Sequence, residues 1–304
     1  MSELNLKQAQ NEVAVEGVFQ ELDIHEGMTK PGRDGKTKEY IRGTVTINVT
    51  QQVGKELEVE EIPISFFATK YKNAGGSNPA YENINQLRGL KRMTTDGEEA
   101  DVIRLSSFGS IGENSFVSRT NGQLINYWNV SGSFFSKVVG TANPRALFKV
   151  KIVIRSIEDE SNSEGPTGRL KIKGIIVQYG GRADVVEFVV EDKQAAAHII
   201  KRFQEKDTIV VGGYIRVTMA TVIGKSATGA GEDMIGEDLD FSSVSSSRRR
   251  ELVITSVSPN PLDGEDAYDM EAIGVALNAR KETLDKKVAD YTATASKPAA
   301  SRGW

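Results

Sequence analysis

Basic and aromatic side chains share one face of several segments whose alternating pattern predicts β-strands. In Glu39–Thr50, Ile41 and Val45 fall on one face, while Tyr40 and Arg42 fall on the other. Cations neutralise phosphates and aromatic rings stack on bases, so this combination is typical of single-stranded nucleic-acid binding. The candidate residues are Tyr40, Arg42, Phe67, Lys70, Tyr71, Lys72, Phe108, Phe116, Lys151, Arg155, Lys171, Lys173, Tyr179, Tyr214 and Arg216.

The largest group of candidates lies in the second half of the chain. Lys171, Lys173 and Tyr179 share one face of a predicted strand, and Lys151 and Arg155 share one side of the strand before it. Lys and Arg are also the commonest way to solvate the outer face of an antiparallel sheet. For any single residue we favour that surface role. For the group, which recurs on corresponding strands, we favour binding.

Adjacent aromatic residues must point to opposite faces of a strand. Phe66 shares a face with Ile64 and is expected in the core, which leaves Phe67 for stacking. By the same alternation, Trp128 is expected in the core and Tyr127 outside it.

Two loops add further candidates. Tyr71 lies between Lys70 and Lys72, a basic-aromatic-basic cluster, and Phe108 and Phe116 flank a Gly-rich turn. The first loop combines a ring with positive charge, and the second combines rings with a flexible, Gly-rich backbone. Both combinations suit a loop that closes around a ligand.

The sequence contains no constellation suited to catalysis. Cysteine is absent, which excludes disulfides, thiol catalysis and Cys-ligated zinc. The histidines, His25 and His198, lack the neighbours of a metal site or a triad. Gly224-Lys225-Ser226 ends like a phosphate-binding loop but lacks its leading glycine. We therefore expect a non-enzymatic protein without metal or cofactor.

Composition places the chain among ordinary globular proteins. With 304 residues it is long enough for two domains, and 38% of residues are hydrophobic. The net charge of −4 counts mildly against nucleic acid, but acidic residues gather in 231–240 and 263–271. A local basic stripe matters more than this total. No apolar run approaches the roughly 20 residues of a membrane span, and 1–11 lacks a signal pattern, so we expect a cytoplasmic protein.

The same order of elements occurs twice along the chain. Each half is predicted to have three strands, a helix and two more strands. In the first half the strands are Val13–Ile24, Glu39–Thr50, Glu61–Thr69, Asp101–Ser110 and Gln123–Lys137, with a helix at Asn78–Leu90. In the second they are Phe148–Ile157, Arg169–Tyr179, Asp184–Glu191, Asp207–Met219 and Glu251–Val257, with a helix at Asp192–Gln204. Asn78 and Asp192 are the expected N-caps.

This duplication predicts two domains and a C-terminal extension. We place the domains at 12–138 and 145–258, with a mobile insertion at 220–250. Residues 259–304 are expected to form an amphipathic helix, about Glu271–Tyr291, and a disordered basic tail that ends in Trp304.

Five strands with a helix between the third and fourth is the strand order of the OB fold. The motifs Glu16-Gly17-Val18, Tyr40-Ile41-Arg42-Gly43, Ile64-Ser65-Phe66-Phe67 and Trp128-Asn129-Val130-Ser131-Gly132 complete the pattern. On these residues the chain resembles single-stranded DNA-binding proteins of bacteria and their phages. The resemblance implies a mainly β protein of two tandem OB barrels, whereas bacterial members typically have one barrel and an acidic C-terminal tail.

The resemblance implies a protein that coats single-stranded DNA without strong sequence specificity during replication or recombination, encoded by a phage or mobile element. Its location would then be the host cytoplasm. Replication or recombination proteins are expected to bind the C-terminal helix or tail, and homo-oligomers are compatible with the pattern. Two alternatives stay open, a viral structural β-barrel protein and a replication adaptor.

Overall fold

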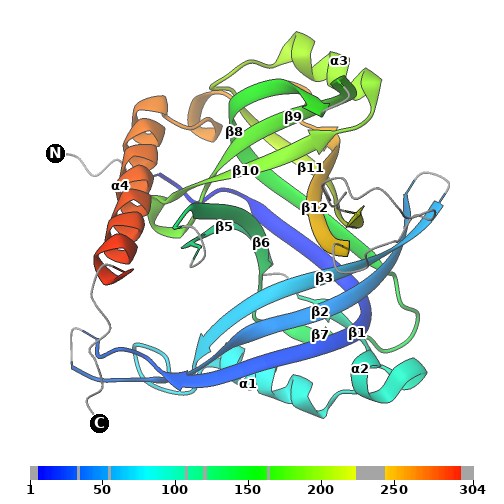
Figure 1. Cartoon of the computed structure of the whole chain (residues 1–304), viewed down its shortest axis with the longest axis vertical. Helices are drawn as coiled ribbons and strands as arrows, with labels where there is room; N and C mark the ends of the chain where they lie inside the picture. The colour runs from blue at the N-terminus through cyan, green and yellow to red at the C-terminus, as the bar shows by residue number, and fades with distance from the viewer. Residues whose placement is uncertain are drawn as a thin grey trace, which may run out of the picture.

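The computed structural model describes residues 6–32, 35–53, 56–106, 109–118, 122–162, 165–223 and 244–295. It confirms a mainly β fold with a C-terminal helix (Figure 1). Phe108 and the tail with Trp304 lie outside the described residues.

The first barrel closes in the strand order that the sequence predicts. β1 (Asn11–Met28) pairs with β2 (Glu39–Val53), which pairs with β3 (Glu56–Thr69). β3 runs parallel to β6 (Leu124–Ser131), and β6 pairs with β5 (Ser110–Val117). β4 (Val102–Leu105) pairs with β1 and with β7 (Phe135–Lys137), which completes the ring.

The fourth predicted strand is interrupted near Gly109, and β5 forms in residues that were expected to be a Gly-rich turn. The fifth predicted strand is divided into β6 and β7 near Gly132. A Cβ on either glycine would lie about 2.4–2.5 Å from a methyl carbon of Leu105, closer than atoms pack. Both glycines therefore let the backbone pass close to Leu105, which is buried in the core. The alternating sequence pattern continues through both breaks and did not reveal them.

The second barrel has the same pairing order. β8 (Arg145–Asn162) pairs with β9 (Gly165–Val177) and with β11 (Thr208–Ile223). β9 pairs with β10 (Ala183–Val190), and β10 meets β12 (Val244–Val257) in parallel at Val189 and Val253. β12 pairs with β11 and closes the ring.

Helices lie between the third and fourth strands of each barrel, as predicted. α1 (Pro79–Gln86) begins after Asn78, whose side chain accepts from the Ala80 N–H, and a short α2 (Met93–Asp96) follows. α3 (Lys193–Arg202) begins after Asp192, whose side chain accepts from the Ala195 N–H. Both predicted N-caps are confirmed.

The ends of the segment expected to be a mobile insertion are strands. β11 and β12 continue as a two-stranded ribbon in which Ala220 pairs with Ser247 and Ile223 pairs with Val244. Residues 218–223 are rich in β-branched side chains, which favour extended backbone. Residues 224–243 lie outside the described residues.

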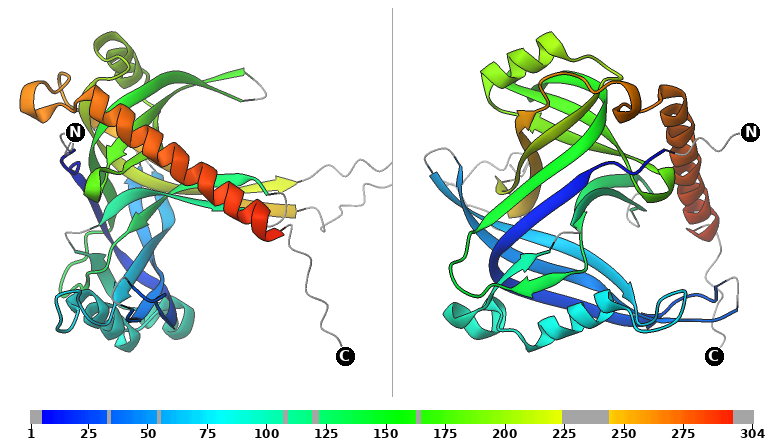
Figure 2. Two further views of the ribbon diagram at one scale, coloured as in Figure 1. Left: turned by 90° about the vertical axis from the view of Figure 1, so that its left-hand side faces the viewer. Right: turned by 180° about the vertical axis from the view of Figure 1, so that it is seen from behind.

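β1 joins the two barrels. Its first residues, Asn11–Glu16, pair with Arg145–Val150 of β8, and its remainder pairs with β2 (Figures 1 and 2). Buried residues of both barrels form one continuous hydrophobic cluster. The buried carboxylate of Glu60 on β3 also accepts from the Val217 N–H of β11. The domain limits at 138 and 145 stay a prediction.

The C-terminal helix α4 (Met270–Ala295) packs beside β5 and β10 (Figures 1 and 2). Its first turns bury Ala272, Ile273 and Ala276. No helix in the described part of the chain is long and apolar enough to cross a membrane.

Candidate nucleic-acid interface

The outer face of β2 and β3 carries an aromatic pair, the half-buried Tyr40 and the exposed Phe67. The rings of Tyr40 and Phe67 lie 5.2 Å apart between centroids at an angle of 33°. Phe67 is 57% exposed, whereas its neighbour Phe66 is buried in the core, as the alternation predicts. Arg42 lies directly across from Phe67 in the register and is exposed. Two rings and a guanidinium therefore share one solvent-facing patch.

The loop after β3 extends this patch. The backbone N–H of Lys70 donates to the Glu39 carbonyl, which anchors the loop to β2, and Tyr71 is 53% exposed. The Lys70 ammonium pairs with the Glu39 carboxylate at 2.5 Å and lies 5.8 Å from the centre of the Tyr71 ring. The hydrogen bond to Glu39 raises the pKa of Lys70 above its ordinary value, and the ion pair holds the cation beside the ring. Lys72 is exposed.

A second exposed aromatic pair lies on the β5–β6 hairpin. Phe116 and Tyr127 meet edge to face with ring centroids 6.0 Å apart, and their exposed fractions are 48% and 40%. The Asn114 amide donates to the Tyr127 hydroxyl at 2.7 Å, which holds that ring in place. Tyr127 faces outward as predicted, although its pairing with Phe116 was not foreseen.

The two aromatic pairs lie on the same face of one sheet. Ser65 of β3 pairs with Ser131 of β6, and both point away from the core, because their neighbours Ile64 and Val130 are buried. Counting every second residue from these serines reaches Phe67 on β3 and Tyr127 on β6. Only small or uncharged side chains separate the pairs on β6, namely Asn129 and Ser131.

The basic group of the second barrel is placed differently, because carboxylates accompany it. Lys171 pairs with Glu160 and Glu187, and Lys173 pairs with Glu158. The sequence pattern identified these cations but did not identify the acidic residues that lie beside them on the same and neighbouring strands. The charge available to a phosphate is correspondingly smaller.

Arg216 is the most enclosed of these cations. Its guanidinium bonds to Glu191 and to Glu251, which is also paired with Arg169. Burial alone would lower the pKa of Arg216, but the hydrogen bonds to both carboxylates raise it above its ordinary value. Burial likewise opposes the charge of Glu251, yet hydrogen bonds from Arg216 and Arg169 lower its pKa. The group is a charge-balanced network.

The other candidates of the second barrel lie apart from one another. The Lys151 ammonium donates to the Asp266 carbonyl at 2.7 Å and lies 5.1 Å from the centre of the Tyr268 ring. The Tyr214 hydroxyl lies 3.4 Å from a Glu191 oxygen. Arg155 is exposed on β8, and Tyr179, in the turn after β9, is 87% exposed.

Comparison with known proteins places the chain in a family. Residues 9–290 match the family model described as YorF. The chain belongs to the YorF family. No curated protein sequence matches this YorF-family chain.

Two similar solved structures are of the single-stranded DNA-binding protein from Thermus aquaticus. The wild-type structure has 10% sequence identity and a TM-score of 0.45, over 87% of the YorF-family chain and 99% of the other. A deletion mutant has 10% identity and a TM-score of 0.44, over 84% and 97% of the two chains.

A cleft of about 1100 Å³ separates β6 from the second barrel of the YorF-family chain. Trp128, expected in the core, is half-buried at its wall. Among the charged residues of its lining, Arg169 and Lys171 face Glu160 and Glu187. The cleft therefore offers two aromatic residues, Trp128 and Tyr127 of the second aromatic pair, but little net positive charge.

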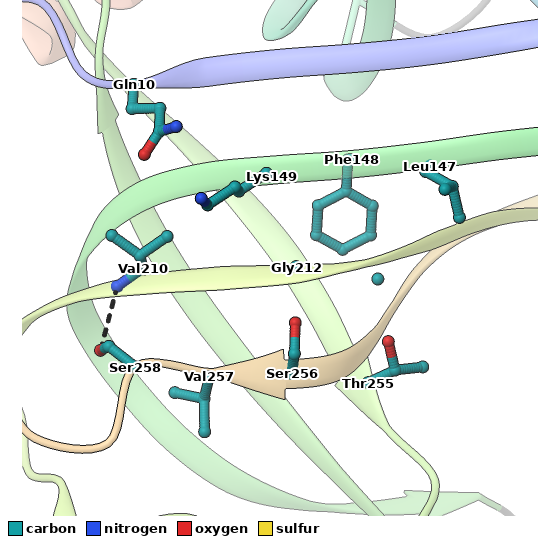
Figure 3. A pocket seen from close by; sticks show the side chains of 11 residues that line it. Gln10, Leu147, Phe148, Lys149, Val210, Gly212, Thr255, Ser256, Val257 and Ser258 are labelled. Carbon is teal, nitrogen blue, oxygen red and sulfur yellow. Dashed lines mark hydrogen bonds between the residues drawn. The ribbon is translucent and has the colours of Figure 1, made fainter.

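A smaller pocket of about 570 Å³ lies over β8, β11 and β12 (Figure 3). Lys149 and Ser256 contribute polar groups to its lining, and Leu147 contributes an exposed apolar side chain. Neither aromatic pair of the first barrel reaches it. The described residues hold no group of His, Asp and Glu side chains suited to a metal ion.

Proposed function

We propose that this protein binds single-stranded nucleic acid on the outer face of its first barrel. The observation that carries the proposal is the placement of Tyr40–Phe67 and Phe116–Tyr127 on one face of β2, β3, β6 and β5. Aromatic rings are usually buried in a protein core, because each ring offers a large apolar surface. Left at the surface in pairs, one of them beside Arg42, these rings match the chemistry of unpaired bases on a charged backbone.

Binding on this face would depend on stacking and on phosphate charge. Each base stacked on a ring contributes on the order of 1–3 kcal/mol, and any base can stack, so sequence specificity is expected to be weak. Arg42, Lys70 and Lys72 are the proposed phosphate contacts, and a phosphate at Lys70 would have to displace Glu39. These contacts make affinity fall as salt rises. A duplex hides the faces of its bases, so single strands are favoured.

We assign the second barrel a smaller share of the binding. The ammonium and guanidinium groups of Lys171, Lys173 and Arg216 already pair with carboxylates, and a phosphate would have to displace those partners. Tyr179 and Arg155 remain exposed and available for a longer strand. Lys151 and Tyr214 are proposed as minor contacts.

The wider role that we propose is the coating of single-stranded DNA during replication or recombination, by a non-enzymatic protein of phage or mobile-element origin. The motifs shared with bacterial and phage single-stranded DNA-binding proteins favour DNA over RNA. Replication or recombination proteins are the proposed partners.

The test is a fluorescence-anisotropy titration of labelled oligo-dT at two salt concentrations, with duplex DNA and RNA as competitors. We expect single-stranded DNA to bind, to outcompete duplex, and to dissociate as salt rises. Equal binding of duplex, or no binding at low salt, would contradict the proposal. Large assemblies formed without DNA in gel filtration would instead favour the structural alternative.

A further inference from the structure

The β5–β6 hairpin extends beyond the barrel with little support from other strands. Among the described residues, β6 pairs with β3 only at Val130 and Ser131. The hairpin residues nearer the turn pair only with each other, down to Val117 and Leu124. A two-stranded hairpin alone is marginally stable in water. Another element must hold it in place.

The C-terminal helix α4 contacts the hairpin through two cations on one of its faces. The Arg280 guanidinium donates to the Glu113 carboxylate, with Nε 2.9 Å from Oε2. The Lys287 ammonium donates to the Ser115 hydroxyl at 2.8 Å and to its carbonyl at 3.1 Å. Arg280 and Lys287 are seven residues apart, which is nearly two helical turns, so both reach the same strand.

Glu113 ties the hairpin to the second barrel as well. Its carboxylate accepts from the Val185 N–H at 3.0 Å, and its own backbone N–H donates to Asp184 at 2.9 Å. The Glu113 side chain is only 7% exposed, and the Arg280 side chain is 18% exposed. A pair enclosed to this degree is screened little by solvent and depends strongly on both partners.

These contacts lie on the face of the hairpin opposite the aromatic pair. Side chains alternate along β5, so Glu113 and Ser115 point one way, while Asn114 and Phe116 point the other. α4 therefore contacts the hairpin face that carries Glu113 and Ser115, and it does not cover the face that carries Phe116 and Tyr127.

We propose that α4 braces the aromatic hairpin, and that Arg280 and Lys287 are positioning residues for Phe116 and Tyr127. The inference rests on the proposed function for its effect on binding, but the brace itself is independent of any ligand. Without the brace the hairpin would sample many positions, and a base would lose a preformed stacking surface. On this view α4 contributes to nucleic-acid binding without contacting the nucleic acid itself.

The test compares Arg280→Ala and Lys287→Ala in the full chain, with Lys281→Ala as the control. Lys281 is an exposed cation next to Arg280 on the same helix. Backbone hydrogen exchange reports on the hairpin without DNA, and anisotropy with oligo-dT reports on binding. Arg280→Lys tests rescue, because it keeps the charge but gives up the two-pronged contact.

We expect both alanine variants to exchange faster at 115–117 and 124–127 while β2 and β3 stay protected. Affinity for oligo-dT should fall roughly three- to tenfold, as when part of one base's stacking is lost. Arg280→Lys should lie between Arg280→Ala and the wild type, and Lys281→Ala should match the wild type.

Unchanged exchange in the hairpin of both alanine variants would overturn the brace. Arg280→Ala leaves the buried carboxylate of Glu113 without its guanidinium partner, which destabilises the folded protein. If that variant unfolds, the milder Lys287→Ala variant still provides the test. Faster hairpin exchange in a protein that never binds DNA would refute the proposed function and leave the brace standing. Faster exchange with unchanged DNA affinity would refute the positioning role.

Discussion

The guanidinium of Arg216 lies between the carboxylates of Glu251 and Glu191, with Nε 3.1 Å from Glu251 and Nη1 3.1 Å from Glu191. The side chains of Arg216 and Glu251 are 16% and 5% exposed. Sequence pattern placed Arg216 among the phosphate contacts, but its hydrogen-bonding capacity is directed into the protein. Its removal should therefore affect folding more than binding.

Replacing Arg216 by Met should lower the free energy of unfolding by about 3 kcal/mol, because Glu251 and Glu191 lose a buried partner. Arg169 remains near Glu251, which keeps the loss at the lower end of the usual range. Urea denaturation measures it. The control is Lys173→Met, which breaks an exposed pair with Glu158 and should cost less than about 1 kcal/mol. Equal losses in the two variants would contradict the assignment.

Acid should weaken the second barrel through Glu251. The pKa of Glu251 is lowered in the folded protein from its ordinary value of 4.5, so the folded state favours the carboxylate. The resulting stability is present above that ordinary pKa and is lost as pH falls through the depressed folded value. Urea midpoints measured from pH 7 down to 3 should drop below about pH 4.5. In Glu251→Gln this part of the pH dependence should disappear. If this variant lost stability in acid as the wild type does, Glu251 would not be the group responsible.

Arg42 should contribute to affinity through charge. In Arg42→Glu the outer face gains a carboxylate where a phosphate would lie, so affinity for oligo-dT should fall about tenfold at low salt. The slope of log affinity against log salt should shrink by about one, as for the loss of one phosphate contact. Lys201→Glu, at the exposed end of α3, makes the same charge change elsewhere. If both variants behave alike, Arg42 acts only through net charge.

The ring of Tyr127, rather than its hydroxyl, should carry the contribution of the hairpin. Tyr127→Ala removes a stacking surface and should weaken oligo-dT binding by about 1–3 kcal/mol. Tyr127→Phe loses only the bond from Asn114 and should stay within about threefold of the wild type. Anisotropy titrations of the two variants decide the point. A larger loss for Phe than for Ala would show that the hydroxyl itself recognises the ligand.

Strand alternation and cap chemistry were enough to predict most of the fold. Ile41 and Phe66 face the core, and Asn78 and Asp192 begin helices, because these features depend only on near neighbours in sequence. The breaks near Gly109 and Gly132 depend on contact with Leu105, a partner that no local pattern specifies.

The candidate site was predictable on one barrel only. The outward positions of Tyr40, Arg42 and Phe67 follow from period-two alternation. The ion pairs of the second barrel required knowledge of which strands are neighbours, since Glu251 reaches Arg216 across 35 residues of sequence. The glutamates at 187, 191 and 251, on or beside the predicted strands, were a sequence signal that the basic residues would be neutralised. Including them lowers the net positive charge expected for the basic stripe.

The measurement that tests the central claim most directly is the affinity of Tyr40→Ala/Phe67→Ala for oligo-dT, beside Ile200→Ala. Ile200 is an exposed apolar residue on α3 of the second barrel, 56% exposed, and matches Phe67 in exposure. Binding on the first barrel predicts a loss of about 2–4 kcal/mol in the double variant, near two stacked bases, with an unchanged melting temperature and a normal Ile200→Ala. Wild-type affinity in a folded double variant would contradict the account.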